Sequence, residues 1–468
     1  MSLPSKPIYL IAALYISTFL CLVDLSSVNL ALSVIQQQFQ SDMADLQWVI
    51  DSYALSLSSL MLAVGALSQR IGRKRLWLIG VLIFILGSVI CAIAPSFSVL
   101  IIGRLIQGLA GAVLIPLALA ILVHHFQQPQ DKAREIGRWS SFSAFSLVVG
   151  PLIGGLMVHY FGWQSIFWLN LPVGILTLYL GWRGIEADQT THVVAFDYLG
   201  LIYSAVAVAT LVYSIIMLQQ ADQIQWLLGC GLIFMLAMMA FIWRQKHAEY
   251  PLIPNHLFKN RPFLAYNAIS FILGFAGYSS LFVFALFYQD QVQLSAAETG
   301  WLIAPQFLMQ AIVSIVFARL AQKYHLIHLL KTGLAMSGVA LLGMLSFQAD
   351  SSLLLYISLA ALLGAGVGLI VPGSSTLIMG TVEPQDINFA AAILNTLRQL
   401  GMTFGVAILG TTMTLVAVRG EQQGLAQTTA QLLAFHSAVV VMGLLFLLAI
   451  CFVRKGALHQ ATPLKDHC

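Results

Sequence analysis

Asp24 is a carboxylate placed within a long apolar stretch of the chain, LVDLSSVNLAL. A charged side chain at the depth of a bilayer is costly, so it normally faces a protein interior or a water-filled cavity and has a function there. A carboxyl group in such a place can bind and release a proton. We therefore interpret Asp24 as a candidate proton-binding residue, with a structural ion pair as the alternative.

Arg104 is the candidate partner of Asp24, because it lies in a second apolar stretch, LIIGRLIQGLAG. At about 1.5 Å per residue, Arg104 and Asp24 lie about 9 Å and about 15 Å below the same ends of their helices, a difference that a guanidinium side chain can bridge. An arginine keeps its charge, so inside a membrane it must be paired or hydrated. It would favour proton release from Asp24 when near and proton binding when withdrawn, whereas a permanent pair would have only a structural role.

Two further charges could bind a small molecule. Asp51 follows Trp48 near one end of its apolar stretch, where it could attract cations or contact lipid headgroups. Arg398, in NTLRQLG, lies deep in an apolar stretch with no acid beside it, so its partner is backbone carbonyl groups, water or a bound molecule. We place Asp24, Asn29, Asp51 and Arg398 in one candidate substrate cavity.

A Gly-Pro string interrupts a further apolar stretch, with Gly150 and Pro151 followed by Gly154 and Gly155. Glycines remove side chains, so that another helix can approach closely. Proline deletes a backbone donor and bends the helix. The string predicts a tight and bent helix contact at the centre of the membrane; close packing without a role in transport is the alternative.

These residues need apolar helices to position them, and the chain supplies such helices along its whole length. It is 59% hydrophobic and only 9% charged, as expected for a chain largely in contact with lipid. Stretches on the order of 20 residues can each cross a bilayer. We predict an all-α integral membrane protein with 14 transmembrane helices, at 8–34, 46–68, 76–94, 98–122, 138–159, 164–182, 198–218, 225–243, 262–288, 299–322, 329–347, 353–380, 388–415 and 432–453.

Lys and Arg residues fall almost entirely on one side of these stretches. Of the 22 in the chain, only Arg419 lies in a connection on the other side, and only Arg104 and Arg398 lie deep within stretches; Arg138, Arg319 and Lys331 lie at the ends of their stretches on the basic side. Cytoplasmic loops are enriched in Lys and Arg, so both termini are predicted to be cytoplasmic. The net charge of +4 reflects this loop bias and does not indicate nucleic-acid binding, because no basic run alternates with aromatic residues.

The connections divide the chain into six, two and six crossings. We predict an N-terminal six-helix bundle at 1–185, a linker with two additional helices at 186–250, and a C-terminal six-helix bundle at 251–468. Many secondary transporters are built from two such halves, with the ligand site between them.

Six motifs in order resemble the major facilitator superfamily, and specifically its fourteen-helix drug:proton antiporters. The resemblance covers essentially the whole chain. The matching segments are Asp24–Leu32, Gly65–Arg75 (GALSQRIGRKR), Arg104 with Gln107 and Gly108, Gly150–Gly155, Trp163–Gly174 and Asn395–Gly401.

This resemblance implies a major facilitator fold and roles for several residues. Asp24 and Arg104 would couple protons, while Gly65, Gln69, Arg70, Gly72 and Arg73 would control conformation together with the Gly-Pro string. Gln69 departs from the family, which usually has Asp there; a neutral amide cannot supply the ion pair attributed to that acid. Asp51 after Trp48 is similar to members that export quaternary cations.

We therefore predict a proton-coupled exporter of hydrophobic, cationic drugs or toxic compounds in the bacterial inner membrane. It would act as a monomer, with protons, a small-molecule substrate and membrane lipid as partners. A dedicated exporter of one metabolite or antibiotic is the alternative, and a membrane-embedded enzyme is a remote one. The sequence contains no Walker phosphate-binding loop, no Cys or His residues at the spacing of a zinc site, and no Gly-x-Ser-x-Gly nucleophile motif. We therefore expect neither a cofactor nor a metal.

Overall fold

The computed structural model of the protein describes residues 7–40, 43–187, 197–217, 224–348 and 350–453. Nearly all residues in these ranges are helical, and no β-strand occurs among them. The prediction of an all-α membrane protein is therefore confirmed.

The first part of the chain forms long helices and a smaller number of short ones. Their bounds are α1 Pro7–Ser27, η1 Val28–Ala31, α2 Leu32–Phe39, α3 Met43–Met61, α4 Val64–Ile71, α5 Arg73–Ala92, α6 Phe97–His125, α7 Pro129–Phe161 and α8 Gln164–Gly184. Two further long helices follow, α9 Tyr198–Met217 and α10 Ile224–His247.

The second part contains long helices, and its first membrane-crossing segment is divided into α11, η3, α12 and η4. The elements are η2 Asn255–Lys259, α11 Arg261–Ile272, η3 Leu273–Tyr278, α12 Ser280–Leu286, η4 Phe287–Gln291, α13 Ala296–Lys323, α14 Leu326–Gly343, η5 Met344–Ser346, α15 Leu353–Gly380, η6 Pro384–Asp386, α16 Ile387–Gln422 and α17 Gln427–Phe452. The segments η3 and η4 are π-helical.

The helices correspond to the predicted crossings. Among the described residues, 13 helices are long and apolar enough to cross a membrane, and α3 with α4 forms another crossing if this pair, bent by 62°, counts as one. The predicted 14 crossings are thus recovered.

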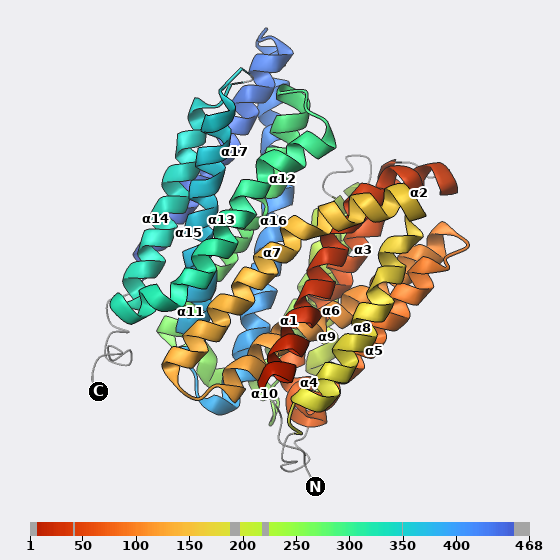
Figure 1. Cartoon of the computed structure of the whole chain (residues 1–468), viewed down its shortest axis with the longest axis vertical. Coiled ribbons are helices and arrows are strands. Elements are labelled where there is room, and N and C mark those ends of the chain that lie inside the picture. Colours follow the sequence, from red (N-terminus) through yellow and green to blue (C-terminus); the bar gives the residue numbers. More distant parts are fainter. Residues whose placement is uncertain (1–6, 41–42, 188–196, 218–223, 349, 454–468) are drawn as a thin grey trace.

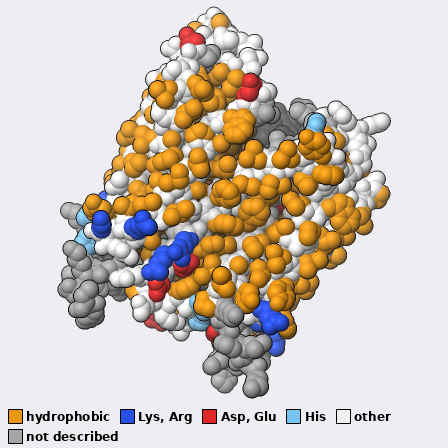
Figure 2. Space-filling view, in the orientation of Figure 1, with side chains coloured by type: hydrophobic (Ala, Val, Ile, Leu, Met, Phe, Trp, Pro, Cys, Tyr) orange, Lys and Arg blue, Asp and Glu red, His pale blue; other side chains and the backbone are white. Residues whose placement is uncertain are grey.

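The long helices form two groups that meet at one end of the molecule (Figure 1). Helices α1 to α8 make one group and α11 to α17 the other, and the two lean apart toward the opposite end. We call the end at which α1 begins and α17 ends the basal end. Figure 2 shows the apolar flank of the molecule, with Lys and Arg side chains gathered toward the basal end.

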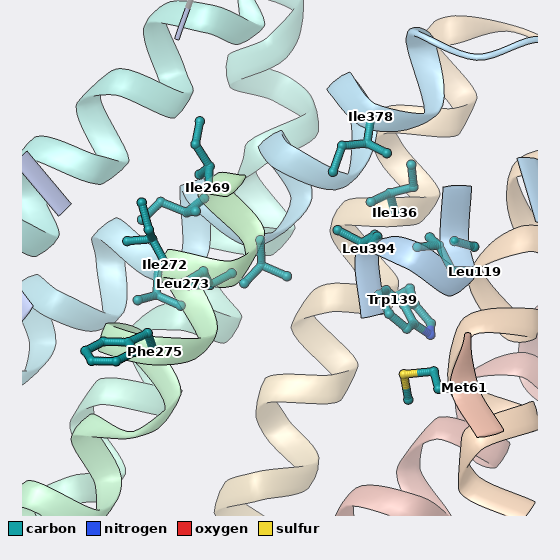
Figure 3. Packing of buried hydrophobic residues seen from close by; sticks show 14 of the residues in the cluster. Met61, Leu119, Ile136, Trp139, Ile269, Ile272, Leu273, Phe275, Ile378 and Leu394 are labelled. Carbon is teal, nitrogen blue, oxygen red and sulfur yellow. The ribbon is translucent and has the colours of Figure 1, made fainter. Parts of the chain in front are cut away.

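The two groups touch through closely packed backbones near the basal end. A Cβ atom on Gly65 of α4 would lie 2.9 Å from Cα of Phe389 in α16. One on Gly137 of α7 would lie 2.7 Å from the carbonyl oxygen of Ser314 in α13. Apolar side chains continue this contact, and Figure 3 shows Leu394 of α16 close to Ile136 of α7 and Leu119 of α6.

Helices α9 and α10 are peripheral. Helix α9 packs on α3 and also contacts α16, whereas α10 packs mainly on α9 and is otherwise largely exposed. Exposed apolar side chains such as Leu228, Ile233 and Met239 on α10 fit contact with lipid.

Candidate functional site: a buried acid–arginine network

Asp24 and Arg104 form an ion pair inside the first helix group. Both side chains are 0% exposed, and Nη1 of Arg104 on α6 donates to Oδ2 of Asp24 on α1. The guanidinium is also fixed to a third helix, because its Nε donates to the carbonyl oxygen of Val49 in α3 at 2.9 Å. The two residues that the sequence singled out are therefore in direct contact.

Two amide side chains complete the binding of the Asp24 carboxylate. Nε2 of Gln107 and Nδ2 of Asn170 donate to Oδ1 of Asp24 at 3.1 and 2.9 Å. The same amide groups also reach the hydroxyl oxygen of Ser88, at 2.8 and 3.2 Å. Gln107 further accepts from Nη1 of Arg104 at 2.9 Å, so α1, α5, α6 and α8 share one buried polar network.

Aromatic rings cover the remaining face of the guanidinium. The central carbon of Arg104 lies 4.6 Å from the ring centroid of Tyr53 and 6.0 Å from that of Phe167. Nη2 of Arg104 has no hydrogen-bond acceptor among the described residues. Cation–π attraction therefore supplements an incomplete set of hydrogen bonds to this buried charge.

Glycines bring the helices close enough for this network. A Cβ atom on Gly87 of α5 would lie 2.8 Å from Cγ of Gln107, and one on Gly103 of α6 would lie 3.0 Å from the backbone nitrogen of Cys91. Helices without side chains at such points can approach closely. This approach places Ser88 and Gln107 opposite each other.

The Gly-Pro string of α7 packs directly against the turn of α1 that follows Asp24. A Cβ atom on Gly154 would lie 2.6 Å from Cβ and 3.0 Å from Cα of Ser27, and one on Gly150 would collide with the side chain of Ser26. Gly155 is partly exposed, and the side chain of Pro151 lies outside the described residues. A close α1–α7 contact thus adjoins the candidate proton site.

The motif between α4 and α5 lies at the basal end and contacts several elements. Nε2 of Gln69 donates to the carbonyl oxygen of Gln385 at 3.1 Å, in the connection before α16. Arg70 lies over the ring of Tyr198 in α9 at 4.8 Å, and Nη2 of Arg73 lies 3.0 Å from Nε2 of His124.

Gly72 ends α4 with a φ of +88°, a conformation that favours glycine because a side chain would be strained there.

Gln69 bridges the two helix groups through its hydrogen bond to the backbone of Gln385. An uncharged amide thus stands where the family usually has an acid.

The other candidate cavity residues do not join the network around Asp24. Asp51 is partly buried on α3 and makes no hydrogen bond or ion pair within the described ranges. Arg398 is buried in α16 of the other helix group. The side chain of Asn29 lies outside the described residues.

Sequence reasoning missed the amide support of Asp24. Asn170 and Gln107 entered the sequence analysis only as parts of family motifs, and Ser88 was not considered. A buried amide in a membrane helix seeks hydrogen-bond partners in neighbouring helices, which is a usable signal. It does not by itself say which helix supplies the partner.

The described residues contain no group of three or more His, Cys, Asp or Glu side chains that could hold a metal ion. The described chemistry of the site is therefore that of a carboxylate, a guanidinium, amides and a hydroxyl group.

The fold and the site together define a multi-pass membrane protein of the transporter class. The family model of the Major Facilitator Superfamily matches residues 14–406 and 266–464. The chain belongs to this superfamily, as its motifs predict, and it is accordingly a transporter of small molecules.

Relatives within the superfamily include antibiotic and drug resistance proteins. The chain is 31% identical over 404 residues to the methylenomycin A resistance protein of Streptomyces coelicolor, covering 86% of this chain and 84% of the relative. It is 32% identical over 407 residues to the multidrug resistance protein Stp of Mycobacterium tuberculosis, covering 84% and 74%. The crystal structure of the human organic anion transporter MFSD10 has the same fold, with a TM-score of 0.67 and 15% identity over 96% of this chain and 98% of that one.

Proposed function

We propose that this protein is a proton-coupled exporter of hydrophobic, cationic drugs or toxic compounds, with Asp24 as the proton-binding residue. The buried Asp24–Arg104 pair carries this proposal. The resistance and multidrug relatives support export of toxic compounds.

Protonation of Asp24 and separation of the pair are linked by charge. A proton on the carboxylate removes the negative charge that neutralises Arg104, so the guanidinium must find other partners. The pair touches α1, α3 and α6, and Asn170 extends the network to α8. A change of protonation therefore acts on four helices at once and can shift the balance between two conformations.

A cation is attracted by a carboxylate that no protein group neutralises. Asp51 meets this condition within the described part of the chain, and it lies about 12 Å from the start of α3 at Met43. We assign it, with Asp24, Asn29 and Arg398, to the substrate path between the two helix groups. Membrane lipid surrounds the helices, and the working unit is a monomer.

The basal end is assigned to the cytoplasm of a bacterial cell, with both termini on that side of the inner membrane. The basic connections support this orientation. The helix groups touch at the basal end, so under this assignment the gate toward the cytoplasm is closed. We retain the division into 1–185, 186–250 and 251–468, which the peripheral packing of α9 and α10 supports.

Export of a single antibiotic is the second candidate function. It is favoured by the relative that is named for resistance to one compound, methylenomycin A. A panel of toxic compounds tested in a host without its own pumps separates the two candidates, because a dedicated exporter protects against one compound class only.

The first prediction tests Asp24 by ethidium uptake into everted membrane vesicles. A proton gradient across the vesicle membrane provides the energy for this uptake. Asp24→Asn keeps the size of the side chain but cannot bind or release a proton. We expect uphill ethidium transport to be abolished while the protein is still made and inserted. Asp24→Glu keeps the carboxyl group about one methylene away and should retain part of the activity.

The control is Arg419→Gln, an exposed arginine at the other end of the molecule, which should transport normally. A purely structural pair predicts misfolded single variants and recovery in the double variant Asp24→Asn/Arg104→Gln. Uphill transport by Asp24→Asn that still collapses when the proton gradient is dissipated contradicts the proposal.

A further inference from the structure

Arg104 and Arg398, the two buried arginines of the described residues, differ in how their charges are neutralised. Arg104 has a carboxylate, a glutamine, a backbone carbonyl and an aromatic ring around its guanidinium. Arg398 is only 7% exposed, yet within the described ranges its one hydrogen bond is from Nη2 to the hydroxyl oxygen of Ser375 at 3.5 Å. Its Nε has no acceptor among the same residues.

No acidic side chain in the described ranges forms an ion pair with Arg398. A guanidinium cannot shed its proton, so burial does not neutralise it as it would a lysine or a carboxylic acid. An unpaired charge at this depth is retained at a cost in free energy. The described protein residues therefore supply no anion to neutralise Arg398, and a bound anion could do so.

The helices around Arg398 are irregular in a way typical of binding sites. The π-helical segment η3 packs against the same part of α16: a Cβ atom on Gly274 would lie 2.9 Å from the backbone nitrogen of Met402, and one on Gly401 would lie 3.0 Å from that of Phe275. π-Helical turns occur frequently at functional sites, and broken helices line the binding sites of many transporters.

The position of Arg398 on α16 places it on the face toward the other helix group. Leu394, four residues earlier, lies on the same helix face. It is close to Leu119 of α6 and Ile136 of α7 in the contact between the two groups (Figure 3). Arg398 lies about 17 Å along α16 from its basal start at Ile387, and its side chain leans back toward that start. Opening of the basal end would therefore expose the guanidinium to molecules that arrive from that side.

We propose that Arg398 binds the carboxylate of a transported compound, so that the substrates include hydrophobic carboxylates and zwitterions in addition to cations. This inference rests on the proposed export function and extends its substrate class. A guanidinium binds a carboxylate through two parallel hydrogen bonds, for which Nε and the terminal nitrogens of Arg398 are available. A zwitterion could also direct its cationic end to Asp51.

The test compares rhodamine B, which carries a free carboxylate, with rhodamine B ethyl ester, which has the same ring system without it. Binding is measured by equilibrium dialysis of the full-length protein in lipid nanodiscs against empty nanodiscs. We expect Arg398→Gln to lower the affinity for rhodamine B by about ten- to a hundredfold, the range of a charge-assisted hydrogen bond, and to leave the affinity for the ester unchanged. Arg398→Lys should lose less, because it keeps the charge but not the planar fork.

Arg419→Gln is the matched control, since it removes an exposed arginine from the same helix without affecting either dye. Arg398→Met should unfold at the same temperature as the wild type or a higher one, because an unpaired buried charge adds no stability. Equal losses for both dyes, a less stable Arg398→Met protein, or a wild type that does not bind rhodamine B would overturn the inference. The ethidium experiment on Asp24 is independent of these results, so the proposed export function can stand if this inference fails.

Discussion

Asp24 receives hydrogen bonds from three side chains on two other helices, and this set of donors fixes the position of its carboxylate. Arg104 contributes a full charge, whereas Gln107 and Asn170 contribute neutral dipoles. A hydrogen bond to a charged group typically contributes about 1.5–3 kcal/mol. The two amides therefore help to hold the carboxylate beside Arg104.

The residue-scale prediction concerns Asn170→Leu, which removes one donor from the carboxylate and leaves the ion pair in place. With one donor fewer, the carboxylate loses a hydrogen bond that holds it between α1 and α8. We expect uphill ethidium transport per inserted molecule to fall by about ten- to a hundredfold, the equivalent of one hydrogen bond to a charged group. Ethidium transport in everted vesicles gives this value.

The matched control is Thr177→Val on the same helix, because Thr177 is buried and, among the described residues, bonds only to the carbonyl oxygen of Val173 in its own helix. That variant should transport ethidium like the wild type. Undiminished transport by Asn170→Leu would show that the amide is not needed for transport.

At this scale the sequence predicted the ion pair but not its surroundings. Asp24 and Arg104 stood out because isolated charges in apolar stretches are costly wherever they lie. Asn170 and Ser88 are ordinary polar residues in helices, and their link to Asp24 depends on how four helices are packed. The unpaired state of Arg398 could likewise be established only from its neighbours in space.

At the scale of elements, the Gly-Pro string joins α7 to the part of α1 that carries Asp24. Gly154→Leu would place a side chain where only 2.6 Å separates the added Cβ from Cβ of Ser27. Overpacking of this kind typically costs about 1–3 kcal/mol and forces the helices apart. We expect a protein that inserts but transports poorly, measured as ethidium transport per inserted molecule.

Leu156→Phe provides the comparison, since Leu156 lies on the same helix and its side chain is 61% exposed. It should transport like the wild type. Full activity of Gly154→Leu would mean that the α1–α7 contact has no role in transport.

The apolar stretches of the sequence correspond to all of the long helices, because a membrane-crossing helix needs a nearly continuous apolar run. The irregular elements were not predicted. The bend between α3 and α4 and the π-helical η3 carry no proline, so their geometry comes from packing partners such as the glycines of α16.

At the scale of the whole molecule, transport requires the basal contact between the helix groups to open and close. The hydrogen bond from Gln69 to the backbone of Gln385 and the close approach of Gly65 to Phe389 join the two helix groups at this end. The sequence indicated the orientation of this end through its basic connections, but the state of closure is a property of the three-dimensional contacts alone.

A reversible cross-link at the basal end tests both its closure and its orientation. Gln69 and Gln385 are exposed and joined by a hydrogen bond of 3.1 Å, so cysteines at both positions should be within reach of a short thiol cross-linker. In a background without native cysteines, we expect the Gln69→Cys/Gln385→Cys protein to lose transport on cross-linking and to regain it on reduction.

A membrane-impermeant cross-linker should act only in everted vesicles, because the basal end would face their exterior. Each single cysteine variant should remain active after the same treatment. Cross-linking from the outside of intact cells would contradict the orientation, and undiminished transport by the cross-linked protein would contradict a gate at this contact.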